Sequence, residues 1–407
     1  MQLAVARMPL ERRVLVWMCV LVAVNQLGFG GMMPSLPLYA QSFGVPASAI
    51  GFAVAVYGLA RFVIALPSGQ MADGLGRRPT LAIGGLISAV GNLWCAWATT
   101  YPEFILARFV AGAGAGLIVT TGQVVLADIS TPERRGRTIA IYQTTFIFAV
   151  GVGPFPGGLL AEYYGLAAPF LASGIASLIA TVVAWFAIIE TRGLTGGKAP
   201  TSPVAALLPF TTQLRLLSGQ TGFVLVSLIA LMNAVVRTGG LFVLIPLLVT
   251  ERLGLSVSVI GFALMLGSVT GLIAAYPAGW LTDRLGRKAV IVPATVMTGV
   301  SMALFSFAPS YPWFLAACIV WGVSSSIGGA APSAYAADSA PPGMNAAAMS
   351  TFRMTGDAGY MVGPIALGVM ADLYGPDAAI GLSAVLLLIV GAAFAMFAPE
   401  THRGRAS

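Results

Sequence analysis

Residues 69–79 read GQMADGLGRRP, and residues 279–289 read GWLTDRLGRKA. The two stretches stand 210 residues apart, and the same offset relates other positions, such as Asp128 and Asp338. Each half of the chain is almost entirely apolar, so the repeat indicates a duplicated membrane bundle. Many secondary transporters are built from such repeats, with the substrate site where the repeats meet.

The composition is that of a membrane protein. Hydrophobic residues make up 58% of the chain and charged residues 9%, whereas soluble domains are about a quarter charged. We therefore expect a lipid bilayer around the chain. The net charge of +7 comes from basic residues in short loops between apolar runs, which fits the positive-inside rule and argues against nucleic acid as a partner. The cysteines lie in apolar runs and the only histidine, His402, lies in the tail, so no metal site is expected.

Twelve apolar runs are long enough to cross the hydrocarbon core, which takes about 20 helical residues. The predicted fold class is an all-α polytopic membrane protein, with twelve transmembrane helices in two pseudo-symmetric six-helix bundles. We expect an N-terminal bundle over 1–189, a cytoplasmic central linker over 190–218, and a C-terminal bundle with a short tail over 219–407. The predicted spans are 14–38, 48–68, 79–99, 102–127, 138–161, 167–189, 219–249, 256–278, 289–308, 312–336, 347–370 and 376–398.

Lysine and arginine are concentrated on one side of these spans. That side has both chain ends, the linker and the loops that contain Arg77, Arg134 and Arg287, whereas the opposite side has only Arg252. The positive-inside rule places the basic side in the cytoplasm. The sequence thus predicts a monomeric, multi-pass protein of the plasma or inner cell membrane with both termini cytoplasmic.

The repeated loop resembles the signature loop of the major facilitator superfamily, in which an aspartate follows a glycine by four residues and Gly-Arg-Arg/Lys comes next. The copy at 279–289 matches it more fully, because the first copy has Gly74 where a basic residue is usual. LGFGGMMPSLP at 27–37, ILARFVAGAGAG at 105–116 and GVGPFPGG at 151–158 are similar to motifs of the twelve-span drug:proton antiporters. The resemblance covers essentially the whole chain and implies alternating access around a midplane cavity.

The resemblance also implies that Asp73 and Arg77 latch the two halves in one conformation and release them in the other. The loop glycines allow tight turns and close helix approach, and the aspartate suits a helix junction. The alternative is a loop whose charges only set orientation, which would require neither the aspartate nor the glycines. The predicted latch residues are Gly69, Asp73, Gly76, Arg77, Arg78, Gly279, Asp283, Arg284, Gly286 and Arg287.

The fifth span is poor in side-chain bulk at Gly151, Gly153, Pro154, Gly157 and Gly158. This run resembles the antiporter motif, which favours export over uptake. It should bend the helix and let a neighbouring helix approach closely. Ordinary small-residue packing is the alternative for each glycine taken singly.

Ionisable side chains inside a membrane are costly and point to function. Away from the loops, the acidic one is Asp357, and the basic ones are Arg61, Arg108, Arg237 and Arg353. Asp357 is either the proton-coupling carboxylate or a structural counter-ion of Arg353, which lies four residues away on the same helix face. Arg108 matches the arginine of the family's fourth-span motif, which implies a role in proton coupling; the alternative is a helix clamp.

Four arginines against one aspartate leave the interior net positive, which favours an anionic or zwitterionic amphiphile over a cationic one. The resemblance places the cavity among spans 1, 4, 7 and 10. The candidate proton-coupling residues are Asp357, Arg108 and Arg353, and the candidate cavity residues are Asn25, Gln26, Arg61, Gln143, Asn233, Arg237 and Ser325.

Three functions follow from these observations. The first is proton-coupled efflux of hydrophobic or amphiphilic small molecules. The second is transport of an anionic metabolite by symport, exchange or facilitated diffusion. The third is a non-transporting membrane receptor, against which the two intact latch loops argue. We expect no enzymatic activity and no cofactor, because no catalytic constellation and no phosphate-binding GxxxxGK[ST] run occurs.

Overall fold

The computed structural model describes residues 9–130, 134–192, 210–341 and 344–400. Most of the predicted linker and His402 lie outside this description, as do the surroundings of Gly279 and the side chain of Asp283. The described chain is helical and has no strand, which confirms the all-α prediction. It forms two compact units, unit 1 (residues 1–45, 53–198 and 256–265) and unit 2 (residues 46–52, 199–255 and 266–407).

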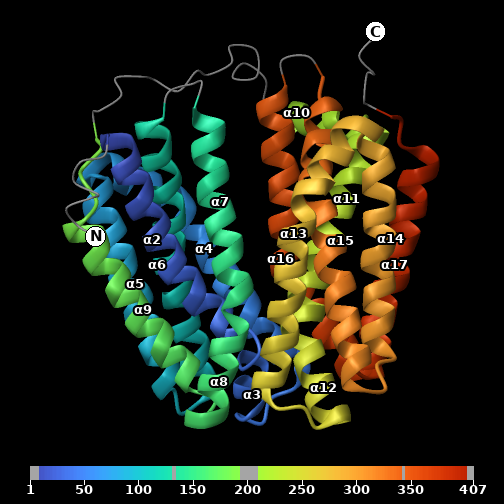
Figure 1. Ribbon diagram of the computed structural model, residues 1–407, viewed down its shortest axis with the longest axis horizontal. Helices are drawn as coiled ribbons and strands as arrows, with labels where there is room; N and C mark the ends of the chain where they lie inside the picture. Colours follow the sequence, from blue (N-terminus) through green and yellow to red (C-terminus); the bar gives the residue numbers. More distant parts are fainter. Residues whose placement is uncertain (1–8, 131–133, 193–209, 342–343, 401–407) are drawn as a thin grey trace. The chain divides into compact units, whose positions relative to one another are not determined.

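Unit 1 contains the first run of long helices (Figure 1). Helix α5 packs against α6 and α9, and α2 packs against α7 and α9. These helices are α2 (Leu10–Met32), α3 (Leu36–Gln41), most of α4 (Ala47–Leu75), α5 (Arg77–Trp97), α6 (Tyr101–Ile129), α7 (Arg135–Val152), α8 (Pro154–Tyr164) and α9 (Ala168–Phe186).

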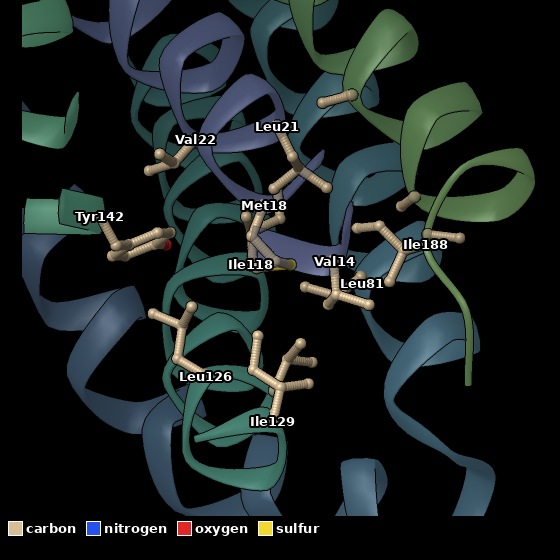
Figure 2. Close-up of a cluster of buried hydrophobic side chains, with 14 residues drawn as sticks. Val14, Met18, Leu21, Val22, Leu81, Ile118, Leu126, Ile129, Tyr142 and Ile188 are labelled. Atoms are coloured by element: carbon tan, nitrogen blue, oxygen red, sulfur yellow. The ribbon is translucent and has the colours of Figure 1, made fainter. Parts of the chain in front are cut away.

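The core of unit 1 is an apolar cluster in which Met18 and Leu21 of α2 lie with Ile118 of α6 (Figure 2). Between α5 and α6 the backbones themselves approach, since a Cβ added to Gly114 would overlap the amide nitrogen of Ser88. In a bilayer, close packing of small residues holds helices together, because lipid tails are as apolar as the side chains.

Unit 2 repeats this packing. Helix α14 packs against α15 and α17, and α11 packs against α16, as their counterparts do in unit 1. The helices are α10 (Phe210–Ser218), α11 (Thr221–Val235), the π-helix η2 (Val236–Leu244), α12 (Ile245–Leu253), most of α13 (Val257–Leu285), α14 (Arg287–Ser306), α15 (Tyr311–Asp338), α16 (Asn345–Tyr374) and α17 (Pro376–Phe397).

The repeat is exact in the turns. Among the described residues, six glycines have positive φ, a conformation that is costly for other residues. They form three pairs at the 210-residue offset, Gly44 with Gly254, Gly76 with Gly286 and Gly165 with Gly375. The same turns therefore follow corresponding helices in both halves.

Within the described chain, eleven helical runs are long and apolar enough to cross a membrane. The remaining long helix is α16, with 30 residues, which contains Arg353 and Asp357. The count is therefore consistent with twelve spans. Three predicted spans are not single α-helices: the first ends at Met32 and is followed by α3, the fifth is divided at Gly153, and the seventh consists of α11, η2 and α12. In the first and fifth spans a proline follows the break, and its ring and missing N–H interrupt the helix.

The unit boundary runs through α4 and α13, whose first turns are capped by acids. In unit 2, Asp372 accepts hydrogen bonds from the backbone N–H groups of Ala47 and Ser48 at 2.8 and 3.1 Å. In unit 1, Glu162, 210 residues earlier, bonds with Ser256 and Ser258 at the start of α13. A carboxylate at this position satisfies free amide groups and interacts favourably with the helix dipole.

Candidate functional site

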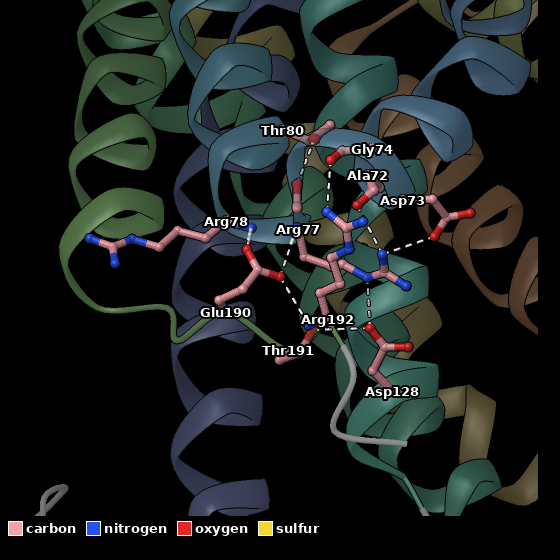
Figure 3. Close-up of polar contacts among 11 residues, drawn as sticks. Ala72, Asp73, Gly74, Arg77, Arg78, Thr80, Asp128, Glu190, Thr191 and Arg192 are labelled. Carbon is pink, nitrogen blue, oxygen red and sulfur yellow. Dashed lines mark hydrogen bonds and ion pairs between the residues drawn. The ribbon is translucent and has the colours of Figure 1, made fainter. Parts of the chain in front are cut away.

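Arg77 joins three helices of unit 1 (Figure 3). Its Nε donates to Oδ2 of Asp128 at the end of α6 at 2.8 Å, and its Nη1 lies 2.9 Å from Oδ1 of Asp73 on α4. Thr191 also donates to Oδ2 of Asp128, at 3.0 Å. The Asp73 side chain is 73% exposed and that of Asp128 16%, so the pair with Asp128 is the less screened by water.

Glu190 caps the start of α5. Its Oε1 accepts from the backbone N–H groups of Arg77 and Arg192 at 3.0 and 2.9 Å, and its Oε2 from that of Arg78 at 3.1 Å. Gly76 has a φ of +108°, a conformation that L side chains rarely adopt, so the turn before α5 favours glycine. Burial raises the pKa of Glu190. The backbone N–H bonds and the charge of Arg77 lower it by more than burial raises it, so the pKa is below its ordinary value.

Arg192 contacts the backbone at the unusual Gly74. Its Nη1 donates to the Gly74 carbonyl at 2.7 Å, so a guanidinium from outside the loop lies beside the residue whose counterpart in the second copy is Arg284.

Unit 2 has the same network with longer bonds. Nε of Arg287 lies 3.4 Å from Oδ2 of Asp338, and Glu400 accepts from the backbone N–H groups of Arg287 and Lys288, both at 3.2 Å. Arg284 is exposed on α13. The sequence prediction missed Glu190 and Glu400 as caps, although both begin Glu-Thr pairs at the 210-residue offset.

Two glycines of the fifth span lie closely against α2. Helix α7 ends at Val152 and α8 begins at Pro154. A Cβ on Gly153 would lie 2.7 Å from the Gly31 nitrogen of α2, and one on Gly157 would overlap the Gly31 carbonyl oxygen. Gly151 and Gly158 are also buried.

Gly69 does not bring helices together in this structure. A Cβ there would meet nothing within 4 Å, so the expected close approach at this position is wrong. In the first loop it is Gly76, with φ of +108°, that has the conformational role.

Arg108 is buried in α6 and is 1% exposed. Its Nε donates to the Ala53 carbonyl at 3.2 Å, and its guanidinium carbon lies 4.4 Å from the centre of the Tyr57 ring, both on α4. These are the contacts of a clamp between α4 and α6. A part in proton coupling stays a prediction.

The other cavity candidates of unit 1 are polar groups within apolar spans. Asn25 and Gln26 are buried in α2, whereas Arg61 of α4 and Gln143 of α7 are half-buried. Their contact with a substrate stays a prediction.

Unit 2 contains a pocket of about 320 Å³, at the lower end of the range for small-molecule sites. Four residues singled out in the sequence line it together: Asn233, Arg237, Ser325 and Asp357. The sequence prediction missed other lining residues, because hydroxyl and aromatic residues in an apolar span carry no signal beyond helix packing. These include Thr298, Trp321 and Tyr360.

Arg237 is the second residue of η2, whose backbone is π-helical over nine residues. Such segments are rare and frequently occur at functional sites. The guanidinium carbon lies 6.0 Å from the ring centre of Trp321 and 5.9 Å from that of Phe242. In the part of the chain that the structure describes, no carboxylate forms an ion pair with Arg237.

Asp357 of α16 lines the same pocket, whereas Arg353, one turn earlier, does not. The expected ion pair between these two residues is absent from the described contacts. A spacing of four residues puts two side chains on one face but does not force them together. Among the described residues, no three His, Cys, Asp or Glu side chains are arranged to hold a metal ion.

Comparison with known proteins agrees with this architecture. The family model of the Major Facilitator Superfamily matches residues 18–236 and 223–407. An uncharacterized MFS-type transporter of Methanocaldococcus jannaschii is 24% identical over 368 residues, which are 90% of this chain and 93% of the relative. Quinolone resistance protein NorA of Staphylococcus aureus is 26% identical over 183 residues, 45% of this chain and 46% of NorA. The crystal structure of the nucleoside transporter NupG has a TM-score of 0.78 at 15% identity, covering 95% of this chain and 98% of NupG.

Proposed function

The chain belongs to the major facilitator superfamily, and on that premise we propose that it exports hydrophobic or amphiphilic small molecules in exchange for protons. Like the proteins that it resembles, it is a multi-pass membrane transporter and not an enzyme. The observation that carries the proposal is the pocket of unit 2, where the carboxyl group of Asp357 is part of the wall. Exchange requires that the substrate and the proton exclude each other, and a titratable group in the substrate pocket supplies that competition.

Two observations support export. The glycine run of the fifth span has the form expected of an antiporter motif, and it divides the helix into α7 and α8 at Gly153. The relative NorA is named for drug resistance, although the match covers less than half of each chain.

The proposal includes the membrane arrangement and the latch. The protein acts as a monomer in the plasma or inner membrane with cytoplasmic termini, and its two bundles, 1–189 and 219–407, alternate about a central linker. The Arg77 network and its Arg287 counterpart hold the starts of α5 and α14, and their rearrangement accompanies the alternation. The role of Asp73 is to compete for Arg77 in one of the conformations.

A second candidate function is transport of an anionic metabolite, which Arg237 favours because no carboxylate among the described residues pairs with it. An anion bound near Asp357 would favour the protonated carboxyl group. Proton and anion would then bind together and move in the same direction. The sign of coupling therefore separates the two candidates.

The test is transport by purified protein in liposomes, with an imposed pH gradient and a panel of cationic, anionic and zwitterionic amphiphiles. We expect uphill movement of substrate opposite to the proton flow, and loss of that movement in Asp357→Asn. The matched control is Glu11→Gln, which removes a carboxylate that is 48% exposed and 3.8 Å from Arg134. Substrate and proton flow in the same direction would support the second candidate. Substrate movement that is unaffected by the pH gradient and by Asp357→Asn would refute proton coupling.

A further inference from the structure

We propose that the pocket of unit 2 recognises a small aromatic zwitterion, with the acidic group of the ligand at Arg237, its ring against Trp321 and its ammonium group at Asp357. The inference rests on the proposed function, since it names the substrate class of the same site.

Arg237 provides the anion site. It lies within the apolar run Thr221–Leu253, where a charge is costly unless it is matched. Its contacts in the described structure are with the aromatic rings of Trp321 and Phe242, which leaves the planar fork of the guanidinium available for an oxyanion. Carboxylate and sulfonate groups fit this fork with two parallel hydrogen bonds.

Asp357 provides an opposite charge at a separate place in the pocket. Both side chains line the cavity, but no ion pair joins them in the described structure, so the nitrogen and oxygen atoms are more than 4.0 Å apart. A ligand with only a negative charge would be repelled by the carboxylate of Asp357, and a ligand with only a positive charge would be repelled by the guanidinium of Arg237. A zwitterion is the class that can meet each group with the opposite charge.

The remaining walls favour a flat apolar body. Trp321 and Tyr360 contribute aromatic rings to the pocket, on which a ligand ring packs well. The hydroxyl of Thr298 already donates to that of Ser324 at 3.1 Å, so these two groups are partly satisfied. A volume of about 320 Å³ limits the ligand to a small molecule.

This assignment also gives the exchange a mechanism. The ammonium group of the ligand and a proton compete for Asp357, whereas the acidic group of the ligand binds at Arg237 and takes no part in that competition. Bound zwitterion therefore excludes the proton even though the ligand has an anionic end.

The test is calorimetric titration of the purified full-length protein with four probes that share one ring system: naphthalene-2-sulfonate, 2-naphthylmethylammonium, the zwitterion N-(2-naphthylmethyl)taurine and neutral 2-naphthylmethanol. We expect the zwitterion to bind about tenfold or more tightly than each of the others, since each charged contact is a charge-assisted hydrogen bond. This order is measured on the unaltered chain and so does not depend on any variant folding.

Two substitutions then assign the charges. Arg237→Gln should weaken binding of the zwitterion and of the sulfonate about 10- to 100-fold and change binding of the ammonium probe little. Asp357→Asn should weaken binding of the zwitterion and of the ammonium probe by a similar factor and should not weaken binding of the sulfonate. Arg215→Gln, on the exposed face of α10, removes the same charge elsewhere and should leave all four affinities unchanged. A zwitterion that binds no better than the neutral probe, or substitutions that weaken all probes equally, would overturn the proposal.

These titrations measure binding without transport, so the proposed substrate class and the proposed proton exchange can be refuted separately. Zwitterion selectivity without proton-driven movement would refute the proposed exchange and leave the substrate class intact. Proton-driven movement of other amphiphiles by a protein that lacks this selectivity would refute the substrate class alone.

Discussion

Replacing Glu190 by glutamine should loosen the first turn of α5. The carboxylate accepts three backbone N–H bonds, from Arg77, Arg78 and Arg192, whereas glutamine offers one acceptor oxygen and presents an N–H₂ group to the other donors. Loss of one charge-assisted bond costs about 1.5–3 kcal/mol, and loss of the negative charge at a helix start adds about 0.3–1 kcal/mol. We expect local opening of this turn to become easier by about 2–4 kcal/mol.

Hydrogen exchange of the amides of residues 77, 78, 80 and 81 measures this opening directly. The pKa of folded Glu190 is lowered, so its stabilisation is present above the ordinary carboxyl pKa and is lost as the pH falls through the folded value. As the pH falls below about 4, protection in the unaltered protein, corrected for intrinsic exchange, should therefore decrease, and this decrease should be smaller in Glu190→Gln.

The matched control is again Glu11→Gln, whose surface ion pair is worth about 1 kcal/mol at most. If Glu190→Gln exchanged no faster at these amides than Glu11→Gln, the capping account would be refuted. Glu400→Gln provides a graded comparison, because the bonds that Glu400 accepts from the backbone of Arg287 and Lys288 are both 3.2 Å, longer than those of Glu190, and the expected effect on α14 is smaller.

Two further predictions concern stability, measured as the unfolding midpoint of purified protein. Gly157→Ala should destabilise the protein by about 1–3 kcal/mol, because the new Cβ would overlap the Gly31 carbonyl. Gly69→Ala should stabilise it by about 0.5–1 kcal/mol, because nothing lies within 4 Å of the new Cβ. Equal effects of the two substitutions would contradict the packing argument. Asp128→Asn should cost more than Asp338→Asn, since the bonds to arginine are 2.8 and 3.4 Å and the acids are 16% and 40% exposed; the reverse order would show that Arg77 takes its support elsewhere.

The repeat made much of the fold predictable. Hydrophobic runs gave the helices, and the 210-residue offset relates the turns at Gly76 and Gly286, both with positive φ. Charges within spans led to Arg237 and Asp357, which the structure brings to one pocket, because a charge in an apolar run stands out where its cost is high.

Other features had no separate signal. The cap at Glu190 was hidden, since an acid after a span resembles any loop charge until the glycine turn that it faces is known. The π-helix over Val236–Leu244 has the same apolar composition as an α-helix, so periodicity does not reveal it. Trp321 resembles a packing residue until the pocket beside it is seen.

The central claim is that substrate and proton compete for Asp357 in this pocket. Proton release on binding of N-(2-naphthylmethyl)taurine to the purified protein, followed with pH indicators over a series of starting pH values, tests it most directly. The account predicts that binding releases protons from the unaltered protein and that Asp357→Asn binds weakly and releases none. Binding without release, proton uptake, or equal release from Asp357→Asn would contradict it.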